Sequence, residues 1–78
     1  MSLKIYTVTC QWDDEAGIWY VSESDVPGLI TEAATVEEMG SKLQRMIPEL
    51  LELNESHDPC REVPFELIAR RREVAACA

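Results

Sequence analysis

Residues 35–53, TVEEMGSKLQRMIPELLEL, decide the fold because they join a helix start signal to a regular apolar stripe. Thr35 and Glu38 fit the capping-box pattern, in which each side chain accepts a hydrogen bond from the other residue's backbone amide. At about 100° per residue, the apolar side chains fall within an arc of about 160°. They are Val36, Met39, Leu43, Met46, Ile47, Leu50, Leu51 and Leu53. Pro48 lies on the polar face, so we predict one bent helix that packs this stripe on a core.

The sequence before this helix predicts three antiparallel strands. Residues 3–12 and 18–23 are rich in β-branched and aromatic side chains, and a polar loop that ends on Gly17 joins them into a hairpin. A proline-glycine turn at residues 27–28 then leads to a short third strand, Leu29 to Ala33. The first half of the chain is therefore predicted to be a meander.

The sequence after the helix predicts a fourth strand. Residues 54–61 form a polar connection, and residues 63–74 return to strand composition. No repeat, linker or low-complexity tract interrupts the chain, so we expect residues 1–78 to be a single domain. We also expect no separate DNA-binding domain. The predicted fold class is α+β in the order β-β-β-α-β, a three-stranded antiparallel meander plus a C-terminal strand, with one helix packed on one face.

Length and charge exclude several classes of function. The chain has 78 residues and a formal net charge of −8, which leaves room for one core but not for two domains with a cleft between them. The negative charge opposes contacts with phosphate, so we expect no direct nucleic-acid binding and favour a basic protein partner. The sequence shows neither an apolar run long enough to cross a membrane nor a signal peptide, so we expect a cytoplasmic protein.

The side chains offer no assembled catalytic site. Cys10, Cys60 and Cys77 lack a C-x-x-C pair, which favours reduced thiols over a disulfide framework or a zinc site. The one histidine, His57, lies close to Cys60 in a polar loop, and this pair is more typical of a solvated loop than of a metal site. We therefore expect no enzyme activity, no cofactor and no metal.

Acidic residues are expected to gather at one end of the sheet. The Asp13-Asp14-Glu15 loop and the helix start, with Glu37 and Glu38, both belong to the end where the first and third strands finish. The helix dipole alone favours carboxylates in a first helical turn, and the loop acids are as consistent with a solvated hairpin as with a binding role. The candidate partner-binding residues are Asp13, Asp14, Glu15 and Glu37, a set that we name the acidic rim.

The last predicted strand is longer than the sheet requires. Its 12 residues, 63–74, would span about 40 Å, against about 26 Å for an eight-residue strand. A projecting strand is an exposed edge that normally pairs, so we predict a homodimer in which this strand contacts a second copy. The candidate dimer residues are Leu67, Ala69, Arg70, Arg71 and Arg72. The same strand carries its three adjacent arginines toward the acidic rim, of its own sheet or of a partner, as complementary charge.

Several short motifs resemble a known family. Residues 25–29, DVPGL, followed by residues 35–39, TVEEM, resemble the D-x-P-G … T-x-E-E signature of the HicB-like antitoxin fold. The hairpin WDDEAGIW at residues 12–19 fits the same pattern, and IPELL at residues 47–51 resembles the small prokaryotic DUF1902 family. The resemblance covers residues 4–72 and rests on chiefly structural motifs. It implies a β-β-β-α-β domain, often dimeric, whose better-understood relatives bind and neutralise a small basic toxin ribonuclease.

Three functional hypotheses follow, in this order. The first is a HicB-like binding module for a small basic partner such as a toxin ribonuclease, which would face the acidic rim. The second is a stand-alone homo-oligomeric interaction or scaffold domain, which the long last strand alone would explain. The third and least favoured is an enzyme that uses the acidic rim with a divalent metal.

Overall fold

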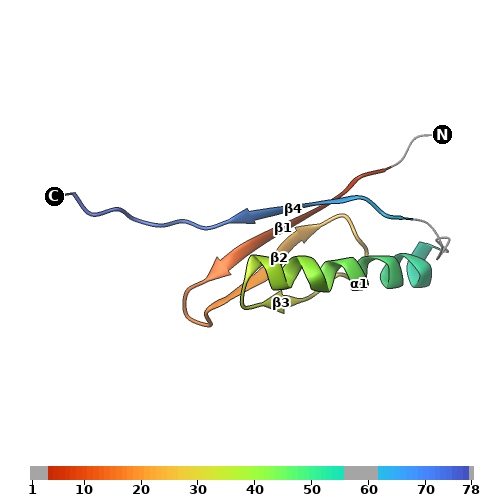
Figure 1. The fold of residues 1–78 in the computed structure, drawn as a ribbon, viewed down its shortest axis with the longest axis horizontal. Helices are drawn as coiled ribbons and strands as arrows, with labels where there is room; N and C mark the ends of the chain where they lie inside the picture. Colours follow the sequence, from red (N-terminus) through yellow and green to blue (C-terminus); the bar gives the residue numbers. More distant parts are fainter. Residues whose placement is uncertain (1–3, 56–61, 78) are drawn as a thin grey trace.

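The computed structural model describes residues 4–55 and 62–77, and within them it has four strands and one helix. The elements are β1 (Tyr6–Asp13), β2 (Ile18–Ser24), β3 (Glu32–Ala33), α1 (Val36–Glu55) and β4 (Phe65–Arg70). The strands form one sheet in the order β3-β2-β1-β4, with α1 against one face (Figure 1). β1 pairs antiparallel with β2 and parallel with β4, and β2 pairs antiparallel with β3. The predicted α+β fold and the order of its elements are confirmed.

The β1–β2 hairpin is closed by Asp13, the last residue of β1. Its Oδ1 atom accepts hydrogen bonds from the backbone amides of Glu15 and Ala16, at 3.0 and 3.2 Å. The amide of Gly17 donates to the Asp13 carbonyl at 2.8 Å, and Gly17 has a φ of 66°, which glycine adopts without the steric penalty of a Cβ atom. The loop is thus held by its own polar groups.

The proline-glycine turn after β2 returns the chain to the core. The amide of Leu29 donates to the Val26 carbonyl across this turn, and both side chains are buried. Gly28 has a φ of 76° at the turn. The third strand is shorter than the predicted strand Leu29 to Ala33, because only Glu32 and Ala33 pair with β2. Leu29 is drawn into the core and Ile30 is exposed, so neither residue adds to the edge of the sheet.

α1 is one continuous helix, as its apolar stripe predicts. It begins where the capping box indicates, since the amide of Glu38 donates to the Thr35 hydroxyl at 3.0 Å. The fully buried side chains of the stripe recur every four residues: Met39, Leu43, Ile47 and Leu51. The prediction was wrong for Leu53, which is 82% exposed because it lies at the border of the stripe in the last turns of the helix. Within the described ranges, α1 lacks the apolar character that a membrane-spanning helix needs.

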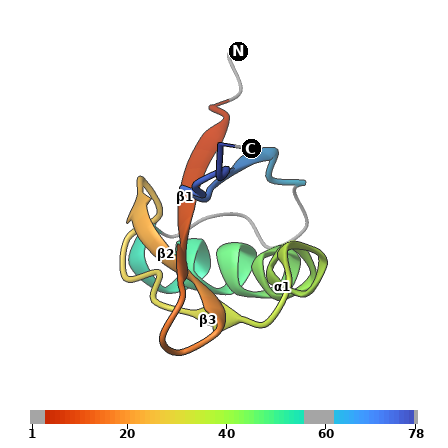
Figure 2. The ribbon, with the colours of Figure 1, turned by 90° about the vertical axis from the view of Figure 1, so that its left-hand side faces the viewer.

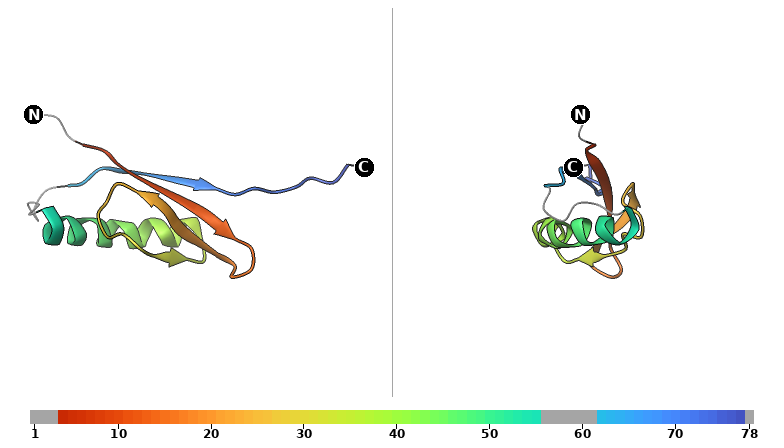
Figure 3. Two further views of the ribbon diagram at one scale, coloured as in Figure 1. Left: turned by 180° about the vertical axis from the view of Figure 1, so that it is seen from behind. Right: turned by 90° about the vertical axis from the view of Figure 1, so that its right-hand side faces the viewer.

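The core lies between α1 and one face of the sheet. Tyr6, Val8 and Cys10 of β1 are buried on this face, and side chains of β2 and β4 pack around them. The alternate residues of β1 point away from the helix. Seen from behind, in the left panel of Figure 3, the sheet lies in front of α1 and no element of the described chain covers it. We name this uncovered side the open face; Figure 2 shows the same arrangement from one end.

β4 ends earlier than the sequence predicts. It pairs with β1 from Phe65 to Arg70, whereas the predicted strand covered residues 63–74. β1 ends at Asp13, where its hairpin turns away, so residues after Arg70 soon lose their neighbour in the sheet. Residues 71–77, which we name the tail, are exposed and run out beyond the sheet (Figure 1). The radius of gyration is 14.7 Å, against about 11.5 Å for a compact chain of this length.

Candidate functional site

The acidic rim lies at the end of the sheet where the β1–β2 hairpin turns. The start of α1 and the end of β4 lie at the same end (Figure 1). Asp13 ends β1, Asp14 and Glu15 lie in the hairpin turn, and Glu37 lies in the first turn of α1. The topology therefore brings two acidic segments, separate in sequence, to one end of the molecule.

Two carboxylates of the acidic rim stabilise the hairpin, and two have no such role. Asp13 caps the loop, and the Oδ1 atom of Asp14 accepts a hydrogen bond from the Trp12 indole at 2.6 Å. The side chains of Glu15 and Glu37 are exposed and make no hydrogen bond or ion pair with the described residues. Glu15 and Glu37 are therefore available to a partner, while Asp13 and Asp14 shape the loop that presents Glu15.

The arginines that follow β4 reach this end, and one of them contacts an aromatic ring. The Arg71 guanidinium carbon lies 4.5 Å from the centre of the Trp12 ring, which is a cation–π contact. Trp12 packs in turn on Trp19 across the hairpin, with ring centres 5.4 Å apart and planes tilted by 59°. Trp12 and Arg71 also line a hollow between the hairpin and the tail. Within one chain, Arg71 therefore contacts an aromatic ring. The pairing of these arginines with the acidic rim of a partner stays a prediction.

Carboxylates on the described surface have no basic partners. Besides Arg71, two described basic side chains make a specific contact, and neither contact is with a carboxylate. Lys4 lies over the Tyr6 ring, and Lys42 donates to the Glu32 carbonyl. Among the described side chains, no ion pair joins a basic group to an acidic one. Because the whole chain has a net charge of −8, its negative potential is not locally cancelled by its own cations.

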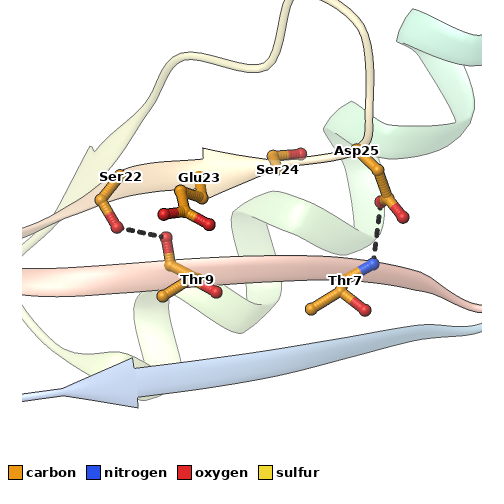
Figure 4. A pocket seen from close by; sticks show the side chains of 6 residues that line it. All are labelled: Thr7, Thr9, Ser22, Glu23, Ser24 and Asp25. Carbon is orange, nitrogen blue, oxygen red and sulfur yellow. Dashed lines mark hydrogen bonds between the residues drawn. The ribbon is translucent and has the colours of Figure 1, made fainter.

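The open face carries a polar recess that sequence reasoning missed. It lies between β1 and β2, where the register shifts by one residue at Ser22, a β-bulge (Figure 4). The Ser22 hydroxyl donates to the Thr9 carbonyl at 3.2 Å, and Asp25 accepts from the Thr7 amide at 2.9 Å. The Glu23 carboxylate has no hydrogen bond or ion pair with the described residues. The recess is therefore a second exposed acceptor surface, away from the acidic rim.

Tyr20 also belongs to the open face. It pairs across the hairpin with Gln11, and its hydroxyl donates to the Gln11 side-chain oxygen at 3.3 Å. The side chain is 37% exposed. Tyrosines that expose an aromatic ring beside a polar group are common at protein interfaces. The open face thus combines a ring with the hydroxyl and carboxylate groups of the recess.

The described thiols lie in different surroundings, and the described acidic side chains do not gather into a metal-binding group. Cys10 is buried in the core, and burial raises the pKa of its thiol above the ordinary range. Cys77 is exposed in the tail. No group of three or more His, Cys, Asp or Glu side chains within the described ranges is placed to hold a metal ion. His57 and Cys60 lie outside the described residues, so the absence of enzyme activity stays a prediction.

Comparison with known proteins adds a family and a structural relative. A family model described as a domain of unknown function, DUF1902, matches residues 5–77. A hypothetical protein from the extremely thermophilic bacterium Thermus thermophilus, known from a crystal structure, is 47% identical with a TM-score of 0.59. The match covers 91% of this chain and 99% of that one. No curated protein matches the chain. Neither description states an activity, a ligand or a partner.

Proposed function

The chain belongs to the DUF1902 family, a domain of unknown function, and from this premise we propose that it is a protein-binding module for a small basic partner. The module acts like an antitoxin: in the cytoplasm it binds and neutralises a small basic ribonuclease toxin. The observation that carries the proposal is the pair of exposed carboxylates at the acidic rim, Glu15 and Glu37, that make no ion pair with the described residues.

Electrostatics give this surface two uses. Complementary charge accelerates the encounter between an acidic and a basic protein and fixes their orientation. A ribonuclease must also hold RNA phosphates with basic side chains, so carboxylates bound at the same positions compete with RNA. Glu15 and Glu37 supply these contacts, and Asp13 and Asp14 hold the hairpin loop in place behind them.

The polar recess offers a second contact for the same partner. From Asp13 at the rim to Thr9 at the recess is a distance of about 13 Å along β1. A typical interface of about 800 Å² per partner spans that distance. The hydroxyls beside Glu23 add hydrogen-bond acceptors, which an arginine of the partner needs because its guanidinium carries five donors. A partner that covers the open face from rim to recess therefore meets carboxylates at both ends.

The test first identifies the genes beside that of this chain and takes from them a product that is a small basic protein. The two proteins are purified, and the dissociation constant is measured by calorimetry at low and at high salt. We expect the double variant Glu15→Lys/Glu37→Lys to bind about 10- to 100-fold more weakly, because two attractive contacts become repulsive. We also expect the wild-type chain, but not this variant, to inhibit RNA cleavage by the basic protein.

The control carries the same change of charge at a different place. Glu49→Lys/Glu52→Lys alters two exposed residues of α1, about 18 Å and about 23 Å further along the helix than Glu37. Binding by this control should weaken much less. Equal weakening by both double variants would show that only net charge matters, and no binding by the neighbouring basic protein would remove the antitoxin-like role.

A second candidate function is a homo-oligomeric interaction or scaffold domain. The unpaired outer edge of β4 and the exposed tail favour it, because both are backbone surfaces that another chain can complete. Self-association without binding of any basic protein would select this candidate over the first.

A further inference from the structure

β4 lies at the edge of the sheet, and no described strand pairs with the backbone groups on its outer side. The amide of Tyr6 donates to the Pro64 carbonyl at 3.1 Å, so Pro64 directs its backbone toward β1. Backbone groups alternate in direction along a strand, so residues 66, 68 and 70 also face β1. The outer edge is formed by the backbone of Phe65, Leu67, Ala69 and Arg71. None of these is a proline, so every one offers both a donor and an acceptor.

The side chains of β4 are complementary to themselves when two copies run antiparallel. In residues 66–70, ELIAR, Glu66 lies two residues before Ile68 and Arg70 lies two residues after it. With Ile68 opposite the partner's Ile68, each Glu66 faces the partner's Arg70 on the same face of the sheet. The backbone groups of residues 66, 68 and 70 point to β1, so these residues form non-hydrogen-bonded pairs with the second copy. In such pairs the side chains approach most closely. We propose that the chain forms a homodimer by antiparallel pairing of β4 with β4, centred on Ile68.

Other registers are less favourable for the charges. Centring the pair on Glu66 places two carboxylates opposite each other, and centring it on Arg70 does the same with two guanidinium groups, both of which are destabilising. Centring it on Leu67 or Ala69 leaves Arg70 opposite Pro64 or Ile68 rather than opposite a carboxylate. Only the register centred on Ile68 pairs both charged residues of β4 with opposite charges.

The same register gives the tail a neighbour. It places Arg71 opposite the partner's Phe65 and Val74 opposite the partner's Glu62. In the single chain, residues 71–74 are exposed, with Val74 93% exposed, and they make no backbone hydrogen bond with the described residues. Pairing residues 62–74 of both copies extends the ladder well beyond β4. Both helices then lie on one side of a continuous sheet, so the open faces stay uncovered.

The test exchanges the two charges of the pair in separate chains. We expect the wild-type chain to be a dimer at micromolar concentration in sedimentation-velocity experiments at low salt. Glu66→Arg and Arg70→Glu should each weaken self-association about 30-fold, because two attractive cross-strand pairs become repulsive. An equimolar mixture of the two variants should recover the dimer, because each variant then supplies the charge that the other needs.

Controls separate pairing from folding and from net charge. Glu66 and Arg70 are exposed, so both variants should keep the wild-type circular dichroism spectrum. Glu49→Arg and Arg45→Glu make the same charge changes on the exposed surface of α1 and should leave the dimer intact. A monomeric wild-type chain, equal weakening by the controls, or a mixture that stays monomeric would overturn the proposal. Glu66 and Arg70 lie outside the acidic rim, so failure here leaves the basic-partner proposal standing.

Discussion

The covered face of the sheet and its outer edge are completed in different ways. On the covered face, α1 of the same chain buries Val8, Cys10 and the side chains around them. At the outer edge, no described strand pairs with the outer backbone of β4, and the arginines of the tail are exposed, although Arg71 also lies over the Trp12 ring. The contrast teaches that this small chain covers one face of its sheet with its own helix and leaves the backbone groups of its outer edge for another molecule.

The covered face should show the largest effect of a single substitution. Leu43 is fully buried in α1, and Leu43→Ala should lower the free energy of unfolding by about 3 kcal/mol, since it removes apolar contacts and leaves a cavity. Leu53→Ala, in the same helix but at an exposed position, should change it by less than about 0.5 kcal/mol. Urea denaturation followed by circular dichroism measures both values. Equal losses would contradict the burial contrast along α1.

Substitutions of two glycines test how the backbone conformation supports the covered face. Gly28→Ala should cost about 1–2 kcal/mol, because a φ of 76° is unfavourable for a residue with a Cβ atom. The new Cβ would lie 3.8 Å from Leu50, an ordinary contact, so the cost comes from the backbone. Gly40→Ala should instead stabilise the protein by up to about 1 kcal/mol, because helix propensity rises and the space is open. Opposite signs in thermal denaturation are the expected result.

The outer edge should show a smaller effect on the isolated chain. Arg71→Ala removes the guanidinium from the Trp12 ring and should cost about 0.5 kcal/mol. It should also change the tryptophan fluorescence of the folded protein. Arg72→Ala makes the same truncation one residue further along the tail, where the side chain contacts no described ring. A fluorescence change with Arg72→Ala but not with Arg71→Ala would contradict the cation–π contact.

The smallest effect should be confined to alkaline pH and should distinguish the two described thiols. Burial raises the pKa of the Cys10 thiol in the folded state. As pH rises through the ordinary thiol pKa of about 8.5, the unfolded chain releases this proton while the folded chain keeps it, so the free energy of unfolding falls. The pH profile of Cys10→Ala should decline less steeply. Cys77→Ala, at an exposed position, should reproduce the wild-type profile.

Local sequence patterns predicted most of the fold. Thr35 and Glu38 located the start of α1, and the apolar stripe identified the helix face that is buried. Gly17 and Gly28 marked turns, and both have positive φ. These features depend on residues that are neighbours in sequence, so a single chain contains the information needed to predict them.

Features that depend on distant neighbours were not predicted. Residues 71–74 have strand composition but lie outside β4, and in the register of β1 with β4 the positions after residue 72 lie beyond Asp13, where β1 ends. The polar recess depends on a bulge at Ser22, which shifts the register and is invisible in the alternation of β2 alone. The contact of Arg71 with Trp12 requires the parallel register between β1 and β4. Composition identified the charges at this end but not the partners they contact.

The parallel pairing of β1 with β4 has a consequence for synthesis of the protein. Tyr6 pairs with Phe65, which lies 59 positions later in the chain, so the contact forms late and slows folding. While the ribosome is still making the chain, the hairpin and α1 can pack together, but β1 has an exposed edge. Such an edge is a template for pairing with other chains. A product released before residue 62 would keep that edge, so incomplete synthesis should yield an aggregation-prone chain.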